Sequence, residues 1–531
     1  MSFNNSAGAR VKRALLAAMV LSLFLGALPA AAQKAQLSPQ VKSALGHISA
    51  DSLRGHLSFI ASDAMAGRNT PSPELDMAAH YIAAQFRRAG LEPAGDDGYF
   101  QTASWKLARQ DMDEFSLKFQ EFSGSINIPK KHVTLGADRA VSLAGAPLLK
   151  VDYKDSARIA SLTPAEVEGR VVITEMPEPR SVAQTERASA MRGRRDFVQK
   201  MEDAKAALII SIDRTRREGS GAGPGRLISP EFPSYYAPSQ VSVITVHDAR
   251  VVEAYDKAGA GELASRVSVN VPAPVEHPVK LRNVIGVLRG SDPALKDTYV
   301  LLTAHYDHLG ARASEPGDNI YNGANDNGSG TVSVIEIASA LARLGKRPRR
   351  SIVFIALFGE EKGLLGARHY GTHPVFPLEK TVAMINLEQV GRTDSNEGPQ
   401  LSNASLTGFD FSTVSTFMKA AGEATGVSVY KHERNSDAFF ARSDNVALAA
   451  LGVPAHTVTV SYVYSDYHGV GDHWEKIDYD NMAKVNRMIA LGLILIADSR
   501  EEPRWNESNP KTGPYVKAWK ARRAGSVTSD K

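Results

Sequence analysis

Short apolar runs alternate with amphipathic stretches along residues 279–498, and this alternation constrains the fold more than any other feature of the sequence. The β-branched runs predict buried strands, and apolar residues at helical spacing predict the helices between them. Such alternation is typical of an α/β domain with a mixed, largely parallel sheet that is covered by helices on both faces. We expect strands at 283–288, 299–304, 352–358, 382–387 and 455–460, and helices at about 331–344, 411–424 and 481–497.

The rest of the chain differs in texture from this region. With 531 residues, the chain exceeds what one hydrophobic core usually organises, so two or more domains are expected. Residues 53–95 show helical spacing, whereas 144–271 carry short β-branched runs between polar loops, with a long mobile loop predicted at 219–230. The proline-rich segment 271–278 predicts a linker. The polar segment 499–531 predicts a tail that docks loosely or frays.

The first 32 residues have the pattern of a targeting segment. Arg10, Lys12 and Arg13 precede an apolar run at 14–28, and small residues follow at 30–32. This order predicts a signal peptide over 1–32. The apolar run is shorter than the roughly 20 residues that span a bilayer, although a retained anchor helix is the alternative. We therefore expect an exported protein, periplasmic or secreted, whose mature chain has no membrane span.

Charge and cysteine content exclude several classes of function. Lys and Arg total 62 against 58 Asp and Glu, a net charge of +4, which is too balanced for a nucleic-acid-binding surface. There is no cysteine, so disulfide frameworks, thiol nucleophiles, iron–sulfur clusters and Cys-bound zinc are excluded. Any metal site must therefore be built from His, Asp and Glu.

Histidine and acidic residues gather where three of the predicted strands end. His305-Tyr-Asp307-His follows the strand at 299–304, Glu360-Glu361 follows 352–358, and Glu388 follows 382–387. A fourth cluster around Asp326 comes just before a predicted helix. Each cluster alone has an ordinary explanation: a hydrogen-bonded pair, a helix start or a turn. Together they indicate a site, because the carboxyl ends of strands form the ligand crevice of open α/β sheets and bare buried carboxylates are costly.

The order of these clusters along the chain and the residues within them resemble the motifs of a known family. The segments 305–310, 321–331, 360–366 and 384–391 are similar to successive signatures of the co-catalytic dinuclear zinc exopeptidases, which include bacterial secreted aminopeptidases and glutamate carboxypeptidases. Arg442-Ser443-Asp444 and Asp466-Tyr467-His468 continue the resemblance. It implies a zinc peptidase catalytic domain over 279–498 and its N-terminal part over 33–143. Residues 144–271 resemble the inserted, β-rich protease-associated domain of many members.

The resemblance implies a site with two Zn²⁺ per chain. One zinc would take His305 and Glu388, the other would take Glu361 and His468, and Asp326 would bridge both. His and carboxylate ligands suit zinc, and three protein ligands per metal leave positions for water and substrate. The family also places a cis peptide bond after the bridging aspartate, here Asp326–Asn327. Most members carry Asp where this chain has Glu388, so the first zinc site is expected to be looser or to prefer another metal.

Two further residues have implied roles beside the metals. Glu360 would be the general base that takes a proton from water and returns it to the leaving amine. Asp307 lies two residues beyond His305, on the same side of an extended strand, and is expected to orient the imidazole of His305. His468, and not the nearby His473, is predicted to be the zinc ligand.

The sequence leaves several functions open. We expect a metallo-aminopeptidase that acts on peptide substrates. A carboxypeptidase or dipeptidase of the same fold is an alternative, because Arg392 or Arg442 could clamp a terminal carboxylate. A single-zinc transferase like the glutaminyl cyclases would not need His305 as a ligand. A non-catalytic binding scaffold would have no need for Glu360.

Overall fold

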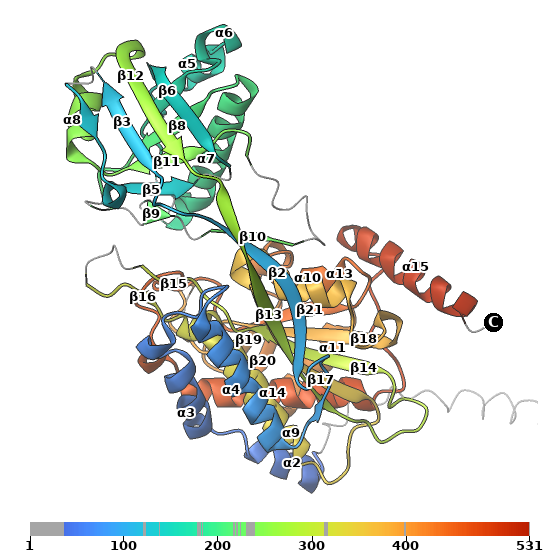
Figure 1. The fold of residues 1–531 in the computed structure, drawn as a ribbon. Helices are drawn as coiled ribbons and strands as arrows, with labels where there is room; N and C mark the ends of the chain where they lie inside the picture. The colour runs from blue at the N-terminus through green and yellow to red at the C-terminus, as the bar shows by residue number, and fades with distance from the viewer. Residues whose placement is uncertain are drawn as a thin grey trace, which may run out of the picture.

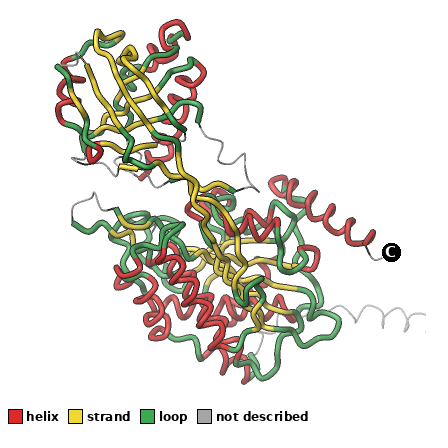
Figure 2. Tube along the Cα trace, in the orientation of Figure 1, coloured by secondary structure: helices red, strands yellow, loops and turns green. Residues whose placement is uncertain are grey.

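The computed structural model describes residues 37–529, apart from 121–123, 137–138, 178–181, 183, 216–217, 219–220, 223–224, 230–238, 313–316 and 398–399. Two large sheets, of ten and nine strands, organise these residues, and helices pack on both sheets (Figures 1 and 2). The predicted signal peptide, residues 1–32, lies outside the described residues. Within the part of the chain that is described, no helix combines the length and the apolar character needed to cross a membrane.

The ten-stranded sheet holds the predicted strands of residues 279–498. Its members are β1 (Glu92–Pro93), β2 (Phe100–Gln110), β10 (Arg226–Ile228), β13 (Pro274–Leu288), β14 (Tyr299–His305), β17 (Ser351–Leu357), β18 (Thr381–Glu388), β19 (Asn403–Leu406), β20 (Ser428–Tyr430) and β21 (Ala455–Thr459). The order is β10-β2-β13-β17-β14-β18-β21-β19-β20, with β1 beside β13. The central strands β17, β14, β18 and β21 are parallel. Strand β13 pairs antiparallel with β2 and β17, and β19 pairs antiparallel with β21 but parallel with β20. The predicted mixed α/β class is therefore confirmed.

Helices cover both faces of this sheet (Figure 1). One face carries α2 (Pro39–Gly46), α3 (Ala50–Ile60), α4 (Pro73–Ala89), α9 (Gly330–Ala342), α11 (Val414–Thr425) and α14 (Tyr479–Asp498). The other carries α10 (Leu365–Thr372), α13 (Asn445–Ala449) and α15 (Gly513–Ser529). Successive strand residues point to opposite faces, so Leu302 joins the first core and Leu301 the second. This two-sided burial explains why β14 and β17 are mostly apolar and are buried along their whole length.

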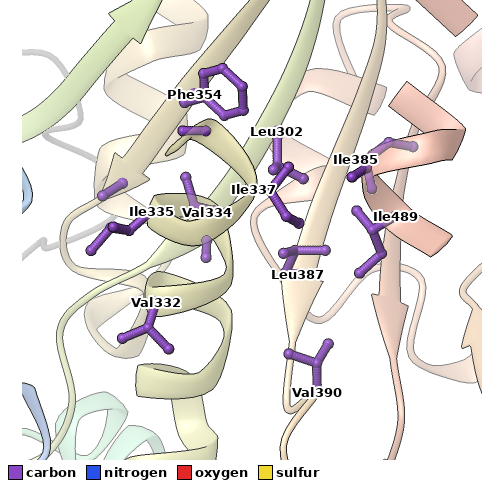
Figure 3. Packing of buried hydrophobic residues seen from close by; sticks show 14 of the residues in the cluster. Leu302, Val332, Val334, Ile335, Ile337, Phe354, Ile385, Leu387, Val390 and Ile489 are labelled. Carbon is purple, nitrogen blue, oxygen red and sulfur yellow. The ribbon is translucent and has the colours of Figure 1, made fainter. Parts of the chain in front are cut away.

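Helix α9 lies at the centre of the first core. Most of its residues are buried, as expected of a helix that is apolar nearly all round. Figure 3 shows Val334 and Ile337 of this helix among Leu302, Phe354 and Leu387 of the sheet, and all five belong to one buried cluster. The position of α9 matters for the site, because the segment that precedes it, η4 (Ala324–Ser329), is held at the edge of the sheet.

The nine-stranded sheet is built from β3 (Ser116–Gln120), β4 (Ile126–Asn127), β5 (Val133–Gly136), β6 (Val141–Lys150), β7 (Val171–Thr174), β8 (Leu208–Ile212), β9 (Gly221–Ala222), β11 (Val243–Val246) and β12 (Gly261–Val271). Helix α7 (Gln184–Asp203) packs on one face and α8 (Ala249–Lys257) on the other. Three of its strands, β3, β4 and β5, lie before residue 144, outside the region that the sequence predicted to be β-rich. They belong to this sheet because β3 pairs with the distant β12 and β5 pairs with β11. Such pairing leaves no trace in local sequence. The assignment of 144–271 to a protease-associated domain stays a prediction.

Two segments that were predicted to be loops contain strands. The proline-rich segment 271–278 was predicted to be a linker, but most of it is strand: β13 begins at Pro274 and pairs with β2 from Pro274 to Val284. Over 274–283, the described ladders join β13 to β2 alone, and proline is tolerated on such an unpaired edge. The long strands β2 and β13 thus connect the two sheets (Figure 1). The segment 219–230, partly outside the described residues, contains β9 and β10.

The C-terminal segment was predicted to dock loosely or to fray, and in the described residues it docks on the core as helix α15 (Gly513–Ser529). Helix α15 packs Tyr515, Val516 and Trp519 against the second core of the ten-stranded sheet. Arg522 donates to the main-chain oxygens of Leu378, Thr381 and Gly452, which fastens the helix at its far end. An apolar face every third or fourth residue within a polar segment accounts for this docking.

Candidate active site

Most of the predicted site residues lie where strands of the ten-stranded sheet end. His305 ends β14, Glu388 ends β18, and Glu360 and Glu361 begin η5 (Glu360–Lys362) just after β17. Because β17, β14 and β18 are adjacent and parallel, their carboxyl ends meet at this edge. Asp326 arrives from η4. His468 lies in the segment between β21 and α14.

Four of the residues predicted as ligands converge around the fifth, Asp326. Its Oδ1 atom lies 3.5 Å from Nε2 of His305, and its Oδ2 atom lies 3.0 Å from Nε2 of His468. On the first side, Oε1 of Glu388 is 3.4 Å from Nε2 of His305. On the second side, Oε1 of Glu361 is 3.2 Å from Nε2 of His468. The aspartate thus faces two separate groups of donor atoms.

Several buried ligand atoms at this site have no partner with hydrogen-bond geometry among the described residues, namely Oδ2 of Asp326, Oε1 of Glu361 and both ring nitrogens of His308. The two oxygens and Nδ1 of His308 instead lie at ion-pair distance within the cluster of histidines and carboxylates. Polar atoms that are buried without a partner are costly, so such a cluster needs a cation or another ligand. Donor atoms of His308, Asp326 and Glu361 lie within 4.8 Å of one another, as do those of His305, Glu360 and Glu388. Nitrogen and carboxylate donors in two such groups fit divalent zinc.

The backbone around Asp326 is closely packed. Gly323 has a φ of +58°, and a Cβ atom there would lie 2.3 Å from the main-chain oxygen of Asp326 and 2.4 Å from the His308 ring. Only glycine fits this position. The peptide bond between Asp326 and Asn327 is cis, as the resemblance predicted.

Asp307 contacts more than the imidazole it was expected to orient. Nδ1 of His305 lies 3.2 Å from the main-chain oxygen of Asp307 and 3.5 Å from its Oδ1. The same Oδ1 accepts the main-chain N–H of Glu360 at 3.0 Å. Oδ2 accepts the hydroxyl of Thr70 at 3.1 Å. Asp307 therefore joins the end of β14 to the start of η5.

Burial and charge act differently on the two adjacent glutamates. Burial raises the pKa of Glu360, the charges of Glu388, Glu361 and Asp444 add to it, and His305 opposes it, so the pKa lies well above its ordinary value. Burial also raises the pKa of Glu361, but His468 and His308 outweigh it and lower the pKa to about 2. Glu361 is thus held as a carboxylate, whereas Glu360 can hold a proton.

The two histidines show the complementary balance. Burial lowers the pKa of His305, yet the charge of Glu388 and the contacts with Asp307 and Asp326 raise it well above its ordinary value. For His468, Glu361 and Asp326 overcome burial and raise the pKa to about 10. Both imidazoles therefore lie in a strongly negative environment that favours a cation.

The structure separates His473 from this group. Nε2 of His473 lies 3.3 Å from Oδ2 of Asp318, and its side chain lines a hollow of about 610 Å³ with residues 61–64 and Trp474. His468 instead points at Asp326 and Glu361, with the ring of Tyr467 stacked on its own ring at a centroid distance of 4.0 Å.

The two candidate arginine clamps differ in their surroundings. Arg392 is 3% exposed, pairs with Asp394 and with Asp466 at 2.9 Å, and lies over the ring of Tyr464. Its donors are therefore engaged within the protein. Arg442 is exposed, and its guanidinium lies 4.4 Å from the centroid of the Phe439 ring.

Sequence reasoning missed several residues at the site. His308 belongs to the motif of His305 and lies with its Nδ1 2.9 Å from Oε1 of Glu361. Asp444 is buried, and burial together with the charges of Glu388 and Asp307 raises its pKa to about 8. Both residues lie within sequence motifs that resemble those of the family, so the motifs themselves could have identified them. Asp472 accepts the main-chain N–H groups of Asn325 and Asp326, and no local signal marked it.

Comparison with known proteins adds family and fold. Residues 283–492 match the family model described as peptidase family M28. A probable zinc metalloprotease of Leptosphaeria maculans is 32% identical over 148 residues, which are 26% of this chain and 33% of that relative. This chain therefore spans only about a third of that relative's length.

Two solved structures share the fold. An aminopeptidase from Aneurinibacillus sp. strain AM-1 has a TM-score of 0.54 at 18% identity and covers 88% of this chain and 100% of its own. A zinc aminopeptidase from Bacillus subtilis has a TM-score of 0.55 at 18% identity and covers 86% of this chain and 97% of its own.

One comparison overturns the predicted location. A vacuolar membrane protease of Tuber melanosporum is 35% identical over 113 residues, 20% of this chain and 10% of that protein. Proteins of the same name from Verticillium alfalfae, Pyricularia oryzae and Colletotrichum graminicola match over 92 residues each. These names place the relatives at a vacuolar membrane, so the prediction of a periplasmic or secreted protein is wrong on this comparison. An apolar run behind basic residues reports targeting to a membrane without specifying the compartment beyond it.

Proposed function

We propose that this chain, whose residues 283–492 match the model of peptidase family M28, is a zinc metallo-aminopeptidase that removes N-terminal residues from peptides. The observation that carries the proposal is the pair of donor groups on either side of Asp326. A single carboxylate that faces two groups of nitrogen and oxygen donors suits a bridging ligand between two metals.

Five side chains would hold the metals. His305 and Glu388 would hold one zinc, Glu361 and His468 would hold the other, and Asp326 would contact both. The buried oxygens of Asp326 and Glu361 that face histidine nitrogens without hydrogen-bond geometry support this assignment, because a bound cation would satisfy them. When bound, the zinc ions would polarise the scissile carbonyl and favour ionisation of the attacking water.

Glu360 would move the proton. Its carboxylate lies 4.0 Å from Nε2 of His305 and its side chain is 15% exposed, so it borders the site without being sealed from substrate. Burial and neighbouring carboxylates raise its pKa, so its carboxylate would bind a proton from water more readily and could then donate that proton to the leaving amine. Asp307 would aid by holding the main chain of Glu360 and the imidazole of His305 in one arrangement.

The site offers positions for a peptide amine. Three protein ligands per metal would leave a coordination position open to a free amine, and the carboxylate of Glu360, which is outside the proposed ligand set, lies beside them. A carboxypeptidase needs a free cationic clamp. Arg392 is already paired with two aspartates, which argues against that role. Arg442 is exposed beside Ser443, a residue that donates to Glu388, so it keeps the carboxypeptidase alternative open.

Peptides blocked at one end test the direction of cleavage. One short peptide is offered free, N-acetylated and C-amidated, with and without a chelator, and the products are identified by mass. The proposal expects cleavage of the free and C-amidated forms, loss on N-acetylation and loss with chelator. Cleavage that survives N-acetylation and disappears on C-amidation would overturn the aminopeptidase assignment and favour Arg442 as a clamp.

Metal content tests the two-zinc assignment separately. Elemental analysis of the purified protein is expected to find two zinc ions per chain. One zinc would favour a single-metal transferase of the same fold, and none would favour a binding scaffold.

A further inference from the structure

Arg68 is a buried cation without an acidic partner. Its side chain is 0% exposed, and among the described residues no carboxylate forms an ion pair with it. Four main-chain oxygens accept its hydrogen bonds: Nε donates to Tyr306 at 2.9 Å, Nη1 to Ile60 at 2.6 Å and Asn322 at 2.8 Å, and Nη2 to Gly323 at 3.0 Å. A guanidinium that is wholly occupied with carbonyls of its own chain does not serve to bind substrate.

These carbonyls flank the donor groups of the candidate metal centre. Tyr306 lies between His305 and Asp307, and Gly323 is three residues before Asp326. One guanidinium therefore joins the segment that ends β14 to the segment that begins η4. The two segments supply donors on both sides of the centre, so their spacing sets the distance between His305 and Asp326.

The main chain around Arg68 makes the same connection. Its carbonyl accepts the N–H of His308 at 3.1 Å, and the carbonyl of Gly67 accepts the N–H of Gly310 at 3.0 Å. Two residues on, the hydroxyl of Thr70 donates to Oδ2 of Asp307. Arg68 has a φ of +45°, in the left-handed region that costs energy for a residue with a side chain. Residues 67–70 thus pack beside the segment that carries His305 and His308 and are hydrogen-bonded to it.

The charge of Arg68 complements the carboxylates around it. Burial lowers its pKa to about 10, while the charges of Asp307, Asp472 and Asp326 act to raise it, so the group stays protonated near neutral pH. A positive charge near these carboxylates offsets part of their mutual repulsion. Lysine could supply this charge but not the planar fork of donors that reaches four carbonyls.

We propose that Arg68 is a positioning residue for the metal centre, holding the His305 and Asp326 segments in register so that zinc binds tightly. The inference rests on the proposed function, since it concerns the same zinc ions. Residues that orient ligands without touching the metal typically contribute 10- to 100-fold to metal affinity. Arg68 therefore controls the affinity for zinc although it lies behind the ligands.

The test compares Arg68 with an equally buried arginine elsewhere. Arg350 is 1% exposed and donates to the hydroxyl of Thr298, at the opposite ends of the central strands from the metal centre. Arg68→Lys, Arg68→Met, Arg350→Lys and Arg350→Met are prepared in the full chain. Zinc affinity is measured against a competing chelator, and the visible spectrum of the cobalt-substituted protein reports on ligand geometry. Circular dichroism checks folding.

We expect zinc affinity to fall about 10- to 100-fold in both Arg68 variants, with an altered cobalt spectrum. Both Arg350 variants should bind zinc within about twofold of the unaltered protein, even where they are less stable, because their guanidinium lies far from the ligands. Unchanged zinc affinity and cobalt spectrum in folded Arg68 variants would overturn the proposal. So would a failure of both Arg68 variants to fold with zinc present while the Arg350 pair folds, since Arg68 would then be structural. If the unaltered protein binds no zinc, it is the proposed function that fails.

Discussion

Asp472 accepts the main-chain N–H of Asp326 at 3.1 Å, and the same carboxylate accepts the N–H of Asn325 and the hydroxyl of Tyr464, each at 3.0 Å. Asp472 is fully buried, so these donors have no water to replace it. The orientation of the bridging carboxylate thus depends on a residue far along the chain. Contacts of this kind hold the ligands of metal sites in place.

Asp472→Ala should therefore weaken zinc binding by about 10- to 100-fold and destabilise the fold by about 1–3 kcal/mol, because buried N–H groups lose their acceptor. Competition with a chelator measures the first effect and urea unfolding the second. Asp472→Asn keeps an acceptor and should recover part of both. Equal zinc affinity in the alanine variant would mean that Asp326 is held by other contacts.

Glu360→Gln should abolish turnover and leave both metals bound, whereas Glu361→Gln should release or weaken one metal. The reason is the contrast between Glu360, whose pKa is raised by burial and neighbouring carboxylates, and Glu361, which is held as a carboxylate by His468 and His308. A general base contributes about 10²- to 10⁴-fold in rate. Rate measurements paired with elemental analysis check this. Metal loss in the Glu360 variant alone would reverse the two roles.

His468→Ala should weaken one zinc, while His473→Ala should leave zinc content unchanged. His468 lies 3.0 Å from Asp326, whereas His473 lies beside Asp318 and lines a separate hollow. The two variants are matched in residue type and lie five positions apart, so each serves as the control of the other. Zinc content per chain decides between them, and the reverse outcome would exchange the assignments.

His456 should make the fold sensitive to mild acid. Its Nδ1 donates to the carbonyl of Thr407 at 2.8 Å and its Nε2 lies 2.6 Å from the hydroxyl of Ser412, which suits a neutral imidazole. Burial lowers its pKa to about 4 from the ordinary value of 6.5. The unfolded chain therefore binds a proton before the folded protein does. The associated stability is fully present above pH 6.5 and is lost as the pH falls towards 4.

That loss corresponds to about 3 kcal/mol, since one pKa unit is about 1.4 kcal/mol. Urea unfolding between pH 7 and pH 4 measures it. His456→Gln should be less stable at pH 7 and should lose less stability on acidification than the unaltered protein. Equal slopes for the two proteins over this range would show that His456 does not titrate on unfolding. A chelator kept in all samples removes any contribution from metal release.

The α/β region over 279–498 could be predicted from sequence because its signals are local. The strands over 283–460 are apolar runs, and the helices at α9, α11 and α14 show regular spacing that a short window detects. His305, Glu361 and Glu388 stand directly at strand ends, so a parallel sheet brings them together by its geometry alone. The convergence of these residues with Asp326 and His468 could thus be anticipated from motif order.

Only the tertiary structure decided which distant segments support that site. Arg68 reaches the carbonyls of Asn322 and Gly323, and Asp472 reaches the N–H of Asp326, across separations of more than a hundred residues. The pairing of β2 with β13 and of β3 with β12 spans similar distances and turns the predicted linker into strand. The local sequence does not identify such partners, because the hydrophobic pattern of a segment is the same whichever distant segment packs against it. Sequence determined which residues could do the chemistry, and the packing of remote segments determined how firmly they are held.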